Sequence, residues 1–131
     1  MQTKFEIFCA YLPYNVSCIT TAKHIFTFGA LNTSVLFYDG VQLILRPLTL
    51  LNTPMKHPVT GEEIENPAEW IADKVWNKTY MGEDVFNALL GNSAFVDVTT
   101  NETRQIDRLA LSLHFDIYGA IERGFAIEVQ P

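Results

Sequence analysis

His114 and Asp116 are the two residues whose types and spacing could support acid–base chemistry. General acid–base catalysis uses a histidine that a carboxylate orients, and Asp107 could serve as a third group. On a helix, however, residues two positions apart point in different directions. Asp116 also has a competing structural role as the N-cap of a short helix. The sequence therefore leaves a small enzyme that uses His114 and Asp116 as an alternative, and it favours a protein without catalytic residues.

The histidines and cysteines do not have the spacing of metal ligands. The chain has three histidines and two cysteines, with no His-x3-His and no Cys-x-x-Cys pattern. The seven glycines are scattered and form neither a phosphate-binding loop nor a nucleophile elbow. We therefore predict no bound metal and no cofactor. We interpret Cys9 and Cys18 as small, buried apolar groups.

An acidic stretch in the middle of the chain is the feature that most resembles a functional surface. The chain has a net charge of −6, and residues 62–107 contain ten acidic and three basic residues. A protein that grips phosphates should carry the opposite charge, so direct binding of nucleic acid is disfavoured. We predict contact with the basic surface of a partner protein, through four residues: Glu65, Glu69, Trp70 and Asp73. The ordinary alternative is a solvated helix face with the tryptophan in the core.

The first half of the chain predicts strands that would support these groups. Residues 15–20 and 24–30 alternate in polarity, and residues 34–38 and 41–45 are separated by Asp39-Gly40. Asp-Gly between two apolar runs is a strong signal for a two-residue hairpin turn. The continuous apolar run at 41–45 indicates a central strand that is buried on both faces. Together these segments predict three or four antiparallel strands in a meander, which Pro47 ends.

The acidic stretch itself predicts helices. Asn66-Pro67-Ala68-Glu69 has the pattern of a capping box with proline at the first helical position, and the helix should run to about Lys78. A second helix is expected from Glu83 to Leu90, with Gly91 at its end. These helices would carry the predicted contact surface.

The last third of the chain is ambiguous in its periodicity. Residues 103–113 fit both a helical and a strand period, and we favour a helix that Thr103 or Asn101 caps. A break near His114, a short last helix capped by Asp116, and a final strand at 125–129 should follow. Gly124 would end that short helix.

Length and composition predict one domain with a substantial core. The chain has 131 residues, of which 48% are hydrophobic and 18% are charged. No segment approaches the roughly 20 apolar residues of a membrane span, and the N-terminus lacks a secretory signal, so we expect a cytoplasmic protein. We predict an α+β fold, with an N-terminal antiparallel β-meander packed on one face by C-terminal helices. Residues 1–131 would form a single domain with a strand-rich part (14–46), an acidic helical middle (62–91) and C-terminal helices (103–124).

Three blocks of sequence stand out together. They are YLPYNVSC at Tyr11–Cys18, LILRPLTLL at Leu43–Leu51 and HFDIYGAIERGFAI at His114–Ile127. In this order they resemble a widespread group of small uncharacterised proteins from phages and prophages of Bacteroidota. In that group the blocks typically read YLPYG, ILRPLSDL and HFDVFGLIEKGLAI. Asn15 stands where the group has glycine, and Leu50 replaces an acidic residue.

The resemblance implies a phage-encoded protein in the cytoplasm of the infected host. Small phage proteins without catalytic motifs often bind host machinery, which is an argument by association. With the acidic stretch, this predicts a non-enzymatic inhibitor of a bacterial defence system that acts by protein–protein contact. An anti-CRISPR protein that acts on an RNA-guided nuclease is the specific case. The enzyme above is one alternative, and a sponge for a nucleotide immune signal is another. The sponge would draw its basic groups from Arg46, Lys56, Arg104, Arg108 and Arg123.

Overall fold

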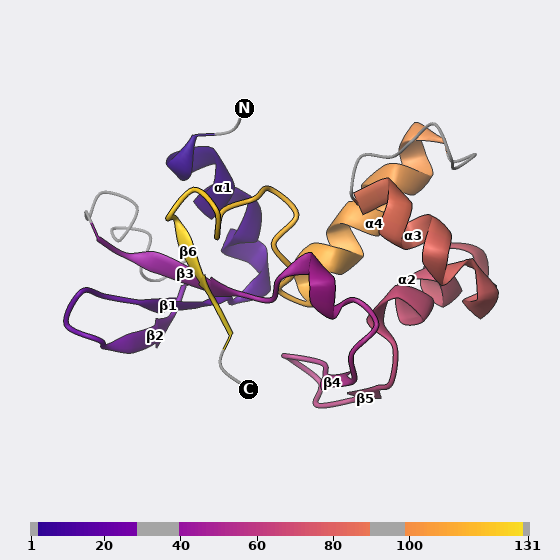
Figure 1. The fold of residues 1–131 in the computed structure, drawn as a ribbon, viewed down its shortest axis with the longest axis horizontal. Helices are drawn as coiled ribbons and strands as arrows, with labels where there is room; N and C mark the ends of the chain where they lie inside the picture. The colour runs from indigo at the N-terminus through magenta and orange to yellow at the C-terminus, as the bar shows by residue number, and fades with distance from the viewer. Residues whose placement is uncertain (1–2, 29–39, 90–98, 130–131) are drawn as a thin grey trace. The chain divides into compact units, whose positions relative to one another are not determined.

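The computed structural model describes residues 3–28, 40–89 and 99–129. Within them the chain has an α+β fold, which confirms the predicted class (Figure 1). The chain divides into two compact units. The first unit contains Met1–Pro47 and His114–Pro131, and the second contains Leu48–Leu113. Each unit is described here by itself, and the prediction of one domain stays a prediction.

The first unit contains a four-stranded sheet with the strand order β2-β1-β3-β6 (Figure 1). Strand β1 (Ser17–Ile19) is antiparallel to both β2 (Ile25–Thr27) and β3 (Gln42–Leu45). Strand β6 (Ala126–Glu128) is parallel to β3. The strands predicted near these positions are therefore present, and β3 lies in the interior of the sheet as expected. The strand predicted at 34–38 lies outside the described residues.

Strand β3 buries one face only, which corrects the prediction that both faces are buried. Leu43 and Leu45 are fully buried, whereas Gln42 and Ile44 are partly exposed. This alternation is typical of a sheet with one covered face. Gly40, before the strand, has a φ of +81°, which suits the turn predicted there. Its turn partner Asp39 lies outside the described residues.

Helix α1 (Lys4–Tyr11) belongs to the first unit and was not predicted from the sequence. Its start is a capping box, because the Thr3 hydroxyl accepts from the Glu6 backbone N–H and the Glu6 carboxylate accepts from the Thr3 backbone N–H. Its buried residues include Phe8, whose ring meets the edge of Phe28 at a centroid distance of 5.7 Å. Helix α1 thus packs on residues that follow strand β2.

The second unit is mainly helical. Helices α2 (Pro67–Trp76), α3 (Gly82–Leu89) and α4 (Thr100–Ser112) all contact one another, as Figure 1 shows. The 3-10 turn η4 (Thr79–Met81) joins α2 to α3. A small hairpin of β4 (Met55–Lys56) and β5 (Glu63–Ile64), which was not predicted, precedes α2. Among the described helices, none has the length and apolar character needed to cross a membrane.

Helix α4 resolves the ambiguity at 103–113 in favour of helix. It is capped by Thr99 rather than by Thr103 or Asn101, and Glu102 completes a capping box. Gly91, the predicted end of the preceding helix, lies outside the described residues. Helix α4 ends at Ser112, so the predicted break near His114 is confirmed.

Residues 117–124 form turns, which corrects the prediction of a short last helix. Both carboxylate oxygens of Asp116 accept backbone N–H groups, from Ala120 at 2.8 Å and from Ile121 at 3.0 Å. Asp116 therefore caps backbone donors as predicted. Gly119 and Gly124 both have positive φ, so the backbone turns back before a helix can form.

Candidate functional site

The four residues predicted as a contact surface lie on helix α2 or just before it. Glu65 is exposed and directly precedes the N-cap Asn66, and Glu69 is exposed in the first helical turn. Asp73 is partly buried and lies one turn beyond Glu69 on the same side of the helix. Trp70 is partly buried and lies on the adjacent side, since successive helical residues are rotated by about 100°. Three of the four residues therefore lie on α2, and Glu65 lies just before its N-cap.

The start of α2 is fixed by a short chain of hydrogen bonds. The Asn66 side-chain oxygen accepts from the Glu69 backbone N–H at 3.0 Å, and the Asn66 amide donates to Asn52 Oδ1 at 3.1 Å. The predicted capping box is formed in this one direction in the described structure. The Glu69 carboxylate thus makes no capping hydrogen bond and is available for another contact.

Trp70 is held at the surface by polar groups on both sides. Its indole N–H donates to Glu62 Oε2 at 3.3 Å, and the ammonium group of Lys74 lies 5.3 Å from the ring centroid. The imidazole of His57 lies 5.7 Å from the same ring. Trp70 is therefore neither a core residue nor a free anchor, because neighbours on the β4–β5 hairpin and on α2 fix its orientation.

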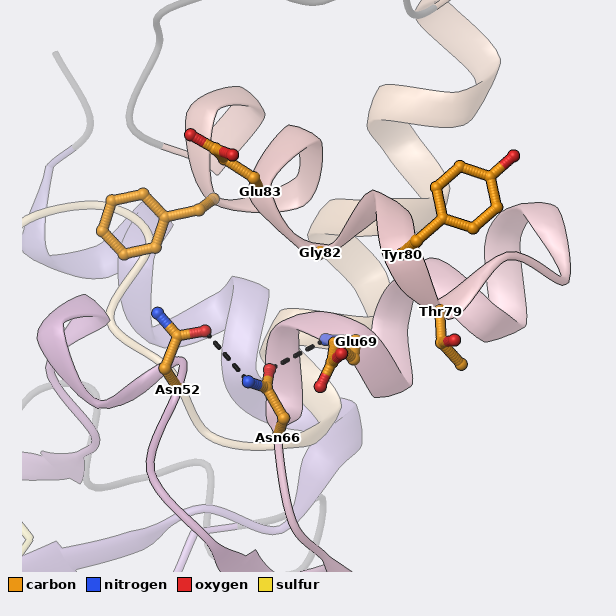
Figure 2. Close-up of a pocket in the computed structure, with 8 residues that line it drawn as sticks. Asn52, Asn66, Glu69, Thr79, Tyr80, Gly82 and Glu83 are labelled. Atoms are coloured by element: carbon orange, nitrogen blue, oxygen red, sulfur yellow. Dashed lines mark hydrogen bonds between the residues drawn. The ribbon is translucent and has the colours of Figure 1, made fainter.

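A pocket of about 430 Å³ opens beside the first turn of α2 (Figure 2). Glu69 is the one predicted contact residue that lines it, and the other lining residues are Asn52, Asn66, Thr79, Tyr80, Gly82, Glu83 and Phe86. The sequence gives a weak signal for these residues, because 79–86 must first fold back onto α2. Gly82 is the one sign in the sequence that this segment packs closely against α2.

Gly82 lets the start of α3 lie against α2. A Cβ atom at this position would stand 3.0 Å from Glu69 Cγ, 3.2 Å from the Glu69 nitrogen and 3.4 Å from the carbonyl carbon of Ala68. Two of these neighbours are backbone atoms, which have little freedom to move. Because Gly82 has no side chain, α3 can pack close to α2, so that Glu69 on α2 and Glu83 on α3 line the same pocket.

The pocket has an uncompensated negative character. Glu69 and Glu83 are both exposed, and neither carboxylate takes part in an ion pair or a side-chain hydrogen bond within residues 3–28, 40–89 and 99–129. By contrast, Glu63 pairs with Lys56 at 3.6 Å. The second unit as a whole contains ten acidic and five basic residues, a net charge of −5. It therefore accounts for most of the negative charge of the chain.

His114 and Asp116 each have structural contacts in the first unit. The Nε2 atom of His114 lies 2.8 Å from the backbone oxygen of Tyr14, and Asp116 caps the turn that follows it. Asp107, the third candidate, belongs to the second unit, where burial raises the pKa of its carboxyl. These contacts favour a structural role for the pair over acid–base catalysis.

Parts of all three blocks with the phage resemblance contact one another in the first unit, which contains Tyr11–Cys18, Leu43–Pro47 and His114–Ile127, whereas Leu48–Leu51 belong to the second unit. The Tyr11 hydroxyl bonds to Phe115 and Ile117, and the imidazole of His114 contacts the backbone of Tyr14. The backbone N–H of Arg46 donates to the carbonyl of His114, and the Arg46 carbonyl accepts from Asp116, both at 2.8 Å. These residues of the three blocks thus form one connected set of hydrogen bonds in the first unit.

The basic residues considered for a nucleotide sponge do not line the acidic pocket. Arg46 lies with its guanidinium 5.9 Å from the Phe115 ring centroid, and burial lowers its pKa. Its Nε atom is buried without a hydrogen-bond partner among the described residues. Arg123 covers the ring of Phe125 at 4.7 Å. A pocket bordered by two carboxylates is a poor place for a phosphate, so this geometry does not favour the sponge.

The cysteines and acidic groups show no metal centre in the described ranges, where no three histidine, cysteine, aspartate or glutamate side chains are arranged to hold an ion. Cys9 and Cys18 are free thiols. Cys18 is fully buried, and burial raises the pKa of its thiol to about 12. Cys18 thus fits the role of a small apolar group that the sequence predicted for it.

Comparisons with known proteins identify no relative of this chain. A scan against protein-family models gives no match, and neither the curated proteins nor the solved structures give one. The phage resemblance therefore stays an expectation that rests on the three sequence blocks.

Proposed function

We propose that this chain is a non-enzymatic binding protein whose second unit docks onto a basic surface of a partner protein. The observation that carries the proposal is the row of carboxylates at the start of α2. Glu65 and Glu69 are exposed and have no ion-pair partner within the described residues. They lie beside Trp70 in the unit that holds a net charge of −5. Such a field speeds encounter with a positively charged surface and disfavours negatively charged ones.

The orientation of Trp70 supports a contact surface of defined shape. A tryptophan that its neighbours already hold loses little conformational freedom on binding, and tryptophan is enriched among the residues that dominate interface energies. Glu62, Lys74 and His57 hold Trp70 in this way. The surface therefore combines long-range attraction with a fixed aromatic group.

We further propose that the partner is a bacterial defence protein, with an RNA-guided nuclease as the leading candidate. The support is the sequence resemblance to phage proteins of Bacteroidota together with the acidic surface. A nuclease of this kind exposes a basic channel for nucleic acid, which an acidic protein surface could occupy. The chain would then act as an inhibitor by contact and would need no catalytic residue of its own.

The test is affinity capture of the tagged chain from the lysate of a Bacteroidota host, with the partner identified by mass spectrometry. The affinity of the captured partner is then measured for the wild-type chain and for the variants Glu65→Lys and Asp73→Lys. A matched control is Glu122→Lys, which reverses one exposed carboxylate in the first unit.

We expect weaker binding for Glu65→Lys and Asp73→Lys, no change for Glu122→Lys, and a loss of affinity as salt concentration rises, because salt screens exposed charges. Equal affinities for all four proteins would contradict the proposed surface. A captured partner that is itself an acidic protein would contradict the proposed basic contact.

A further inference from the structure

We propose that His57 is a pH-sensitive switch in the loop between β4 and β5. While its imidazole is neutral, the loop keeps the conformation in which Glu62 bonds to Trp70, and protonation of the imidazole opens the loop. The switch is a property of the chain without any partner. Its consequence for binding rests on the proposed function, since Trp70 belongs to the proposed docking surface. All three residues lie in the second unit.

The half-buried side chain of His57 fixes the backbone of this loop. Its Nδ1 atom accepts hydrogen bonds from the backbone N–H groups of Val59 at 3.1 Å and Thr60 at 3.3 Å. Its own backbone N–H donates to the carbonyl of Glu62 at 2.8 Å, and its carbonyl accepts from the N–H of Gly61 at 3.0 Å. His57 therefore closes the loop through both its backbone and its imidazole.

The same loop positions the carboxylate that holds Trp70. The Thr60 hydroxyl oxygen accepts from the Glu62 backbone N–H at 3.2 Å, and Glu62 Oε2 accepts from the Trp70 indole N–H at 3.3 Å. The imidazole of His57 also lies beside the indole, with ring centroids 5.7 Å apart. A change in the loop at Val59 and Thr60 would therefore alter the position of Glu62 and, through it, that of Trp70.

Protonation of His57 is incompatible with the closed loop. A neutral imidazole has one acceptor nitrogen, whereas the imidazolium cation carries a proton on both nitrogens and can only donate. Nδ1 would then face the N–H groups of Val59 and Thr60 as a third donor, and both hydrogen bonds would be lost. A backbone N–H group cannot accept instead, so the loop must move. The loop is therefore closed at neutral pH and opens as the pH falls through the range in which histidine protonates.

The charged groups around the imidazole come from the hairpin and from α2. On the hairpin they are the Glu62 carboxylate, which accepts from Trp70, and the ion pair of Lys56 with Glu63 at 3.6 Å. On α2 the ammonium group of Lys74 lies 5.3 Å from the Trp70 ring centroid. Glutamate and lysine side chains in general titrate near pH 4.3 and 10.4, whereas histidine titrates near pH 6.5. A change between about pH 7.5 and about pH 5.5 therefore points to a histidine.

The experiment is an NMR titration of the full-length, ¹⁵N-labelled chain from about pH 7.5 to about pH 5.5. It follows the backbone amides of Val59 and Thr60 and the indole N–H of Trp70, which is assigned with Trp70→Phe. We expect these three signals to shift together as the pH falls. Their protection from exchange with water, relative to unstructured peptides, should fall over the same range. The indole N–H of Trp76, which donates to Glu102, is the internal control and should keep its signal.

Variants of His57 distinguish the switch from a mere change of charge near Trp70. Asparagine has a side-chain oxygen that accepts from backbone N–H groups two residues on, and it does not titrate. We expect His57→Asn to keep the neutral-pH signals of Val59, Thr60 and Trp70 over the whole range. His57→Ala lacks the acceptor and should show unprotected amides at Val59 and Thr60 at every pH. His24→Asn, which removes an exposed histidine of the first unit, should behave as the wild type.

Signals of Val59 and Thr60 that stay in place in the wild type, or that move equally in His57→Asn, would overturn the switch. Protected amides at both positions in His57→Ala would overturn it as well. These measurements need no partner, so their failure leaves the proposed docking surface standing. If the switch operates while charge reversal on α2 leaves the captured partner bound, the docking surface is wrong and the switch holds.

Discussion

The Tyr11 hydroxyl donates a hydrogen bond of 2.5 Å to the backbone oxygen of Phe115, across 104 residues of sequence. The Tyr11 hydroxyl oxygen in turn accepts a hydrogen bond from the backbone N–H of Ile117 at 3.3 Å. Tyr11 is fully buried, and burial raises the pKa of its hydroxyl. The hydroxyl therefore stays neutral and can both donate and accept a hydrogen bond. One side chain on helix α1 thus ties the beginning of the first unit to its end.

Tyr11→Phe should destabilise the first unit by about 1–3 kcal/mol, because it removes one hydroxyl and leaves a buried carbonyl and a backbone N–H without this partner. Chemical denaturation that is followed by circular dichroism measures the change. Tyr80→Phe is the matched control, since Tyr80 is 78% exposed and should tolerate the same loss. Equal stability of the two variants would show that the buried bonds contribute nothing.

Gly82→Ala should destabilise the second unit by about 1–3 kcal/mol, because the new methyl group would lie 3.0 Å from Glu69 Cγ and close to the α2 backbone. Glu69→Ala removes the Cγ atom and should relieve part of this strain. The stabilities of the two single variants and the double variant form a cycle that measures the coupling. Strict additivity of the two changes would contradict the close approach of α3 to α2.

The stability of the second unit should fall in acid through Glu102. The backbone N–H of Thr99, and then the indole N–H of Trp76, donate hydrogen bonds that lower the pKa of the Glu102 carboxyl. The folded state therefore binds this proton less tightly than the unfolded state. The stabilisation is complete above the ordinary glutamate pKa of about 4.3, and it is lost as the pH falls through the lower folded value.

Unfolding free energies measured from neutral to acidic pH check this sign. Glu102→Gln should show a smaller fall in stability with acid than the wild type, whereas Glu83→Gln, whose carboxylate has no recorded ion pair within the described residues, should keep the wild-type slope. An unchanged slope for Glu102→Gln would contradict the assignment.

Cys18 should react with iodoacetamide far more slowly in the native protein than in denaturant at the same mildly alkaline pH. Burial both excludes the reagent and raises the pKa of the thiol to about 12, so the reactive thiolate is scarce. Peptide mapping by mass spectrometry follows Cys18 separately from Cys9. Rapid native labelling of Cys18 would show that strand β1 opens readily.

Strands β1 to β3, the three helices of the second unit and the final strand β6 could be predicted because each has local signals. Asn66-Pro67 marks the start of α2, alternation marks β1 and β2, and a continuous apolar run after Gly40 marks β3. Helix α1 was missed because its residues include several aromatic and β-branched side chains, although Thr3 and Glu6 form a capping box. The last predicted helix failed because the positive φ of Gly119 overrides the cap at Asp116.

Only part of the candidate site, the acidic side of α2, could be predicted from the sequence. Glu65, Glu69 and Asp73 follow a spacing that can be read directly, so the acidic side of α2 was predictable. Tyr80 and Glu83 reach the pocket only because Gly82 allows α3 to approach α2, which is a tertiary contact. Spacing along one helix carries no information about such a contact.

The positions of the tryptophans and cysteines divide the chain into two separately observable halves. Trp70 and Trp76 both belong to the second unit, and the chain has no other tryptophan, so fluorescence excited selectively at tryptophan reports on that unit. Cys9 and Cys18 both belong to the first unit, so thiol accessibility reports on the other. If residues 1–131 form one cooperative domain, the two signals will change at the same denaturant concentration. Two separate midpoints would instead identify two independently folding units.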